Sequence, residues 1–131
     1  MREDRIETRA WIASVRVIGP LRADHPARLE ASVELRDGYH LNAARPILLL
    51  PSIDPALRFE KIRVGRDDGI ELFACPEDAA QACRAVLSVR FTAVEGHPAP
   101  SRAGGTLVFS ACDGRRCFSE RVALSARLAE P

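Results

Sequence analysis

The sequence predicts an all-β protein that folds as an antiparallel β-sandwich of immunoglobulin-like type. Short segments in which apolar and polar residues alternate recur along the 131 residues, and this period of two marks strands with one buried face. Turn dipeptides such as Asp-Gly and Gly-Pro separate the segments. About seven short strands at near-regular spacing, with turns between them, are typical of two packed antiparallel sheets.

Length and composition indicate one domain, 1–131, with a core of its own and a flexible start at 1–9. Hydrophobic residues make up 47% of the chain and charged residues 28%, as in ordinary globular proteins. The net charge of +1 excludes a general affinity for nucleic acid or anionic membranes. No apolar run approaches about 18 residues, so we expect no membrane insertion.

The first half of the chain contains two clear strands. Residues 11–18 (WIASVRVI) are rich in β-branched residues and end at Gly19-Pro20. Residues 28–36 alternate cleanly, so that Leu29, Ala31, Val33 and Leu35 should face the core. Asp-Gly then turns the chain into 39–43, and the apolar run 46–51 (PILLLP) is bracketed by prolines, which favours an edge or linker segment.

The second half continues the same rhythm with one interruption. Residues 57–64 predict a strand with imperfect alternation, 66–69 a turn, and 70–73 a short strand. Residues 77–82 depart from the β pattern and are expected to form about one helical turn. Residues 84–93 resume it, and Ala85, Leu87, Val89 and Phe91 should share a buried face.

The segment 104–127 predicts a β-hairpin with a cysteine at each side of its mouth. Two alternating apolar stretches flank a polar loop that begins with Asp113-Gly114, a strong turn dipeptide. Directly opposed residues of antiparallel strands lie about 4.5–5.5 Å apart at Cα, which suits a disulfide. A bond between Cys112 and Cys117 is therefore geometrically easy.

This bond is a candidate for reversible chemistry as well as for a static structural role. It would close a very short loop, so its entropic stabilisation is only about 2 kcal/mol. Arg115 and Arg116 beside Cys117 favour its thiolate, whereas Asp113 beside Cys112 opposes ionisation. Spacing by itself leaves both interpretations open.

Two segments resemble a known family. Residues 111–118 (ACDGRRCF) are similar to the redox hairpin of the amino-terminal domain of DsbD-type thiol:disulfide interchange proteins. Residues 37–43 (DGYHLNA), followed by Arg45-Pro46, resemble that family's segment of glycine, aromatic, histidine, apolar residue and asparagine. The resemblance covers most of 27–128. One departure is Ser119-Glu120, where the family often carries an apolar or aromatic residue and prolines.

The resemblance implies an immunoglobulin-like fold and a protein-disulfide reductase activity. In this interpretation Cys117 forms the mixed disulfide and Cys112 resolves it. The implied partners are thioredoxin-like domains, with a membrane electron-conducting protein as a further donor, and electrons pass on to oxidised periplasmic proteins. No cofactor is expected, because disulfide exchange proceeds by thiolate attack.

The other two cysteines lie where the family carries a loop that shields the redox pair. Cys75 and Cys83 are expected to form a structural disulfide, with a second redox pair as the alternative. Phe73, directly before this loop, is a candidate apolar shield over Cys117, although core packing explains it equally well. A zinc site built from all four cysteines is disfavoured, because C-x7-C and C-x4-C match no usual finger spacing.

The remaining residues point to no other chemistry. The three histidines, His25, His40 and His97, are scattered, and a lone histidine near a strand end is usually structural. No nucleophilic triad, metal motif, phosphate loop or dinucleotide fingerprint occurs. With five Phe, one Tyr and one Trp there is no stacking platform for nucleic acid.

Compartment signals in the sequence conflict. Four cysteines fit two disulfides in an oxidising compartment, whereas the polar start MREDRIETR lacks the apolar core of a signal peptide. The resemblance favours the bacterial periplasm, with the leader absent from this chain. The alternative to an exchange domain is a redox-inert periplasmic interaction module with two permanent disulfides.

Overall fold

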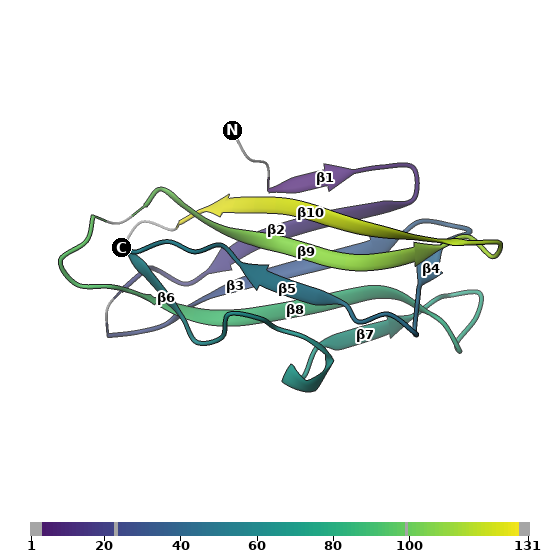
Figure 1. The fold of residues 1–131 in the computed structure, drawn as a ribbon, viewed down its shortest axis with the longest axis horizontal. Helices are drawn as coiled ribbons and strands as arrows, with labels where there is room; N and C mark the ends of the chain where they lie inside the picture. Colours follow the sequence, from purple (N-terminus) through teal and green to yellow (C-terminus); the bar gives the residue numbers. More distant parts are fainter. Residues whose placement is uncertain (1–3, 23, 99, 129–131) are drawn as a thin grey trace.

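Two antiparallel sheets pack face to face in the computed structural model of the chain, which describes residues 4–22, 24–98 and 100–128 (Figure 1). One sheet has the order β1 (Arg5–Glu7), β2 (Trp11–Ile18), β3 (Ala27–Leu35), β8 (Ala82–Ala93) and β6 (Leu57–Phe59). In this sheet β7 (Glu71–Ala74) also pairs with β8. The predicted all-β antiparallel sandwich is therefore confirmed.

The second sheet carries the cysteine hairpin. It has the order β10 (Cys117–Arg127), β9 (Arg102–Cys112) and β4 (His40–Leu41), and β5 (Leu48–Pro51) pairs with β9 beside β4. The tip of the β9–β10 hairpin lies at the end of the sandwich opposite β6 (Figure 1). The hairpin predicted over 104–127 is thus confirmed.

The core forms between the two sheets from the faces that the alternation predicts. Leu29, Val33 and Phe91 are fully buried in the first sheet, and Leu107 and Leu124 are fully buried in the second. The Trp11 and Phe109 rings meet edge to face across the sheets, with centroids 5.3 Å apart. Burying each such side chain stabilises the fold by about 1.5–3 kcal/mol.

Two local predictions were wrong. The strand predicted over 57–64 ends at Phe59, and Ile62 is 88% exposed. In this exposed part of the chain, Glu60 forms an ion pair with Arg90, and Lys61 forms one with Asp68. A 3₁₀ turn at Arg66–Asp68, ended by Gly69 at φ 77°, follows at the predicted turn.

The helical turn predicted over 77–82 is absent. These residues form a loop in which Gln81 N–H donates to the Asp78 carbonyl at 3.1 Å, and Ala82 already belongs to β8. A helix would separate residues 75 and 83 by about 12 Å along its axis, whereas their Cα atoms lie 4.7 Å apart. The disulfide therefore rules out a continuous helix across the whole loop, and the backbone bond between Gln81 and Asp78 closes a turn there instead.

Two further features concern the chain start and membranes. Residues 5–7 of the predicted flexible segment form β1 and pair with β2, while residues 1–3 of that segment lie outside the described part of the chain. Within the described ranges, no helix reaches the length and hydrophobicity of a membrane span.

Candidate functional site

The tip of the hairpin is a tight turn closed by Asp113. Its N–H donates to the Arg116 carbonyl at 3.1 Å, and its Oδ1 accepts the amides of Arg115 and Arg116 at 3.0 and 3.1 Å. Gly114 adopts φ 94°, which few other residues tolerate. The Asp-Gly signal in the sequence thus produces the turn that sets the two cysteines opposite each other.

Cys112 and Cys117 occupy directly opposed positions at the ends of β9 and β10 and are joined by a disulfide. Their Cα atoms are 4.0 Å apart. Cys112 is 4% exposed, whereas Cys117 is exposed. The two sulfurs are therefore unequal, because a visiting thiolate meets the Cys117 side of the bond first.

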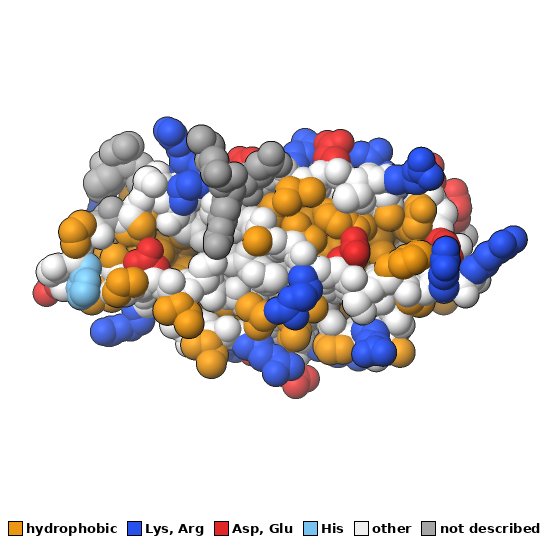
Figure 2. Space-filling model, turned by 45° about the horizontal axis from the view of Figure 1, so that its top comes forward, with side chains coloured by type: hydrophobic (Ala, Val, Ile, Leu, Met, Phe, Trp, Pro, Cys, Tyr) orange, Lys and Arg blue, Asp and Glu red, His pale blue; other side chains and the backbone are white. Residues whose placement is uncertain are grey.

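Acidic and basic side chains lie close together at the hairpin tip. The two backbone amides that bind Asp113 lower the pKa of its carboxyl group, as does the nearby Arg116 guanidinium. Arg116 lies over the Phe118 ring, 5.1 Å from its centroid, and Phe118 is 41% exposed. Figure 2 shows basic and apolar side chains together at this end of the molecule.

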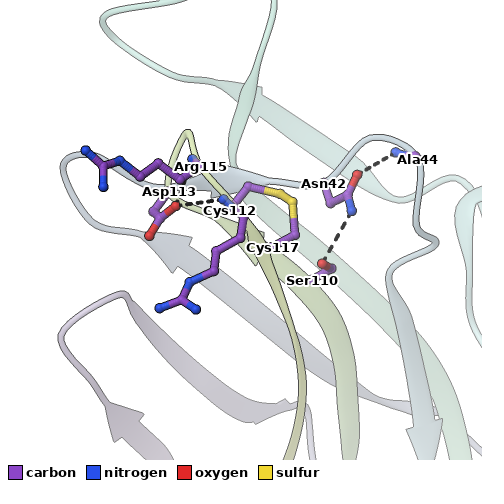
Figure 3. Close-up of a disulfide and its surroundings, with 8 residues drawn as sticks. Asn42, Ala44, Ser110, Cys112, Asp113, Arg115 and Cys117 are labelled. Atoms are coloured by element: carbon purple, nitrogen blue, oxygen red, sulfur yellow. Dashed lines mark hydrogen bonds between the residues drawn. A yellow bond between two sulfur atoms is a disulfide. The ribbon is translucent and has the colours of Figure 1, made fainter.

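The short strand β4 forms the other side of the site. His40 is in direct register with Cys112, and the next residue of this face, Asn42, is tied to Ser110. Asn42 N–H donates to the Ser110 carbonyl at 2.9 Å, and Asn42 Nδ2 lies 3.5 Å from Ser110 Oγ (Figure 3). These residues alternate with Leu41, Phe109 and Ala111, which belong to the core. The disulfide therefore lies on the face of its sheet turned away from the core.

The second disulfide joins Cys75 and Cys83 and lies beside β4. Cys83 Sγ approaches the Tyr39 carbonyl oxygen to 3.3 Å, and because a disulfide sulfur carries no proton, this is a packing contact. The pairing expected from the sequence is present, so all four cysteines are bonded in pairs. The structural role expected for the Cys75–Cys83 disulfide stays a prediction, as does the alternative of a second redox pair.

A cavity of about 440 Å³ is lined both by this second disulfide and by the β3–β4 connection. His40, Tyr39, Cys83 and Phe73 are among its lining residues. Phe73 is 40% exposed, and the Arg84 guanidinium lies 4.9 Å from its ring centroid. The structure thus places Phe73 in this cavity wall under Arg84, and its shielding of Cys117 stays a prediction.

The sequence assigned no chemistry to His40, yet the structure places this residue next to the disulfide. Pairing between β4 and β9 joins residues about 70 positions apart, so no local pattern reveals it. The signal was present in the segment 37–43, whose histidine is in register with Cys112 and whose asparagine is bonded to Ser110. His25 and His97 are exposed in loops.

Comparison with protein-family models, curated proteins and solved structures gives no match to this chain.

Proposed function

We propose that this protein is a thiol:disulfide exchange domain that cycles Cys112 and Cys117 between disulfide and dithiol. The observation that carries the proposal is the unequal exposure of two directly opposed cysteines at a hairpin tip, Cys112 buried and Cys117 exposed. Exchange requires access to one sulfur and a defined leaving group at the other. The proposal includes that the domain works in a compartment that permits disulfides, such as the bacterial periplasm.

The proposed reaction begins when a thiolate of a thioredoxin-like partner attacks Cys117 Sγ. The Cys112–Cys117 bond breaks, a mixed disulfide forms between the partner and Cys117, and Cys112 leaves as a thiolate. The partner's second thiolate then attacks its own sulfur in the mixed disulfide and releases Cys117. The partner dithiol is oxidised and this domain is reduced by two electrons. The reduced Cys117 can then attack the disulfide of an oxidised target protein.

Charge at the tip supports a partner with acidic groups around its redox cysteines. Arg115 and Arg116 are exposed and directly precede Cys117. Phe118, which follows it, adds a half-exposed aromatic ring. Complementary charge of this kind mainly raises association rates and excludes wrong partners. A brief, specific encounter is what electron transfer between two proteins needs.

The reduction potential of the Cys112–Cys117 bond tests the proposal. Equilibration against glutathione or dithiothreitol buffers, with mass spectrometry of alkylated peptides, assigns the potential to each disulfide separately. Exchange carriers fall at about −120 to −270 mV, whereas structural disulfides fall below about −300 mV. A value below that limit would leave the redox-inert interaction module as the function.

Trapping provides the second test. Cys112→Ser leaves Cys117 as the attacking thiol and is expected to accumulate a mixed disulfide with a thioredoxin-like protein. Cys117→Ser is the matched control, because its remaining thiol is buried. Equal trapping by the two variants would contradict the assigned roles.

A further inference from the structure

His40 stands directly opposite Cys112 on the neighbouring strand. Opposed residues of paired strands present their side chains on the same face, with Cβ atoms about 4.5–5.5 Å apart. His40 is half-buried and Cys112 is buried. The register of β4 thus puts the His40 side chain on the same face of the sheet as the side chain of Cys112.

The position of His40 is fixed on both sides. The Tyr39 carbonyl packs against Cys83 Sγ at 3.3 Å, and Asn42 is bonded through its amide to Ser110 of β9 at 2.9 Å. A two-residue strand at a sheet edge would otherwise fray. Groups that act in chemistry are usually held in this way by neighbours that do not react.

The departure of Cys112 as a thiolate must be stabilised by a neighbouring group. In the proposed exchange this sulfur becomes a thiolate, and the charged form of a buried group is disfavoured. A cation or proton donor beside it lowers the cost, and better-stabilised leaving thiolates depart faster. The two tip arginines lie on the far side of Asp113 in the sequence, whereas His40 is in direct register with Cys112.

We propose that His40 is the acid–base residue of Cys112, an inference that rests on the proposed exchange function. As the partner thiolate bonds to Cys117, the S–S electron pair moves to Cys112, and protonated His40 stabilises the thiolate or transfers its Nδ1 or Nε2 proton to it. The products are the mixed disulfide, the Cys112 thiol and neutral imidazole. In reoxidation the neutral ring accepts the Cys112 proton.

Other charged groups share the surroundings of His40. Those lining the same 440 Å³ cavity come from β3, the β3–β4 connection, the 75–83 loop and β8: Glu34, Arg36, Asp37, Glu77, Asp78 and Arg84. Arg45 and Arg66 line a second hollow of about 560 Å³ that also includes His40, and Asp113 follows Cys112 at the tip. The test therefore changes only position 40 and keeps these groups.

The experiment measures the rate at which dithiothreitol reduces Cys112–Cys117 across about pH 5 to 8, the range in which histidine side chains commonly change charge. Each rate is divided by the thiolate fraction of dithiothreitol, and alkylated peptides identify the reduced bond. In the wild-type protein the corrected rate should rise as pH falls. In His40→Gln it should be about tenfold lower at acidic pH and flat with pH.

Two further variants separate chemistry from structure. His97→Gln removes an exposed loop histidine and should keep the wild-type profile. His40→Lys keeps a cation that does not titrate in this range, so it should restore the rate without the pH dependence. Unfolding curves of each variant check the fold.

The outcomes distinguish the two proposals. Wild-type exchange with equal profiles for His40→Gln and His97→Gln overturns the role of His40 and leaves exchange intact. A slow, pH-dependent His40→Gln also overturns it, because the pH response then comes from another group. If dithiothreitol fails to reduce wild-type Cys112–Cys117, both proposals fall.

Discussion

The indole N–H of Trp11 donates a hydrogen bond to Glu120 Oε2 at 2.7 Å, joining β2 of one sheet to β10 of the other. The Trp11 ring also packs edge to face on Phe109, the residue directly opposite Glu120 in the hairpin. One side chain therefore anchors the β9–β10 hairpin to the other sheet by a polar and an aromatic contact. Glu120 thus supplies an anchor for the hairpin.

Replacing Trp11 by Phe should lower the free energy of unfolding by about 2 kcal/mol, because the bond to the charged Glu120 is lost from a part-buried site. Urea denaturation followed by circular dichroism measures the change. Glu120→Gln keeps an acceptor and should cost less. Equal stability of Trp11→Phe and wild type would show that the bond contributes nothing.

In the reduced protein, iodoacetamide should alkylate Cys117 at least about tenfold faster than Cys112, because only exposed thiols meet the reagent readily. Mass spectrometry of timed samples gives both rates. The ratio should collapse in denaturant, which is the control. Equal rates in the folded protein would contradict the unequal exposure on which the exchange proposal depends.

Phe73→Ala should speed alkylation of reduced Cys117 if Phe73 shields it, as the sequence predicts. Leu72→Ala is the matched control, since Leu72 is its exposed neighbour on β7. An unchanged rate of Cys117 alkylation in Phe73→Ala would show that Phe73 does not shield this thiol. Its contact with Arg84 would then be a packing contact.

The hairpin tip should loosen only in strong acid. Hydrogen bonds from the Arg115 and Arg116 amides lower the pKa of Asp113 below its usual 3.8, so its stabilising effect is present above that value and is lost as pH falls through the lowered pKa. The Arg115 and Arg116 amide shifts in NMR spectra should therefore titrate below pH 3.8. In Asp113→Asn this transition should vanish. A midpoint above 3.8 would contradict the bonding seen here.

Removing the second disulfide with Cys75→Ala and Cys83→Ala should lower the free energy of unfolding by about 2.5 kcal/mol, because the bond closes a short loop. Urea denaturation measures it. The Cys112–Cys117 bond should still form in this variant, which peptide mapping checks. Full stability without the second disulfide would argue against its structural role.

Most of the fold was predictable because strand alternation is a local signal. Residues 11–18 form β2 as predicted, and the inward residues of 28–36 and 84–93 are buried as predicted. The errors fall at 57–64 and 77–82. At 57–64 the strand pairing with β8 covers only Leu57–Phe59, and at 77–82 a disulfide joins the two ends of the loop, and local periodicity contains neither relationship.

The sequence by itself determined the hairpin, its turn and the opposition of Cys112 and Cys117, because all of these depend on neighbours within about 25 residues whose alternation and turn chemistry are written locally. Only the tertiary structure decided that Cys112 is buried, that Trp11 holds Glu120, and that His40 stands beside Cys112. These relationships arise from sheet pairing and packing between distant segments. Register between such segments is set by the burial of the whole fold rather than by any short stretch of residues.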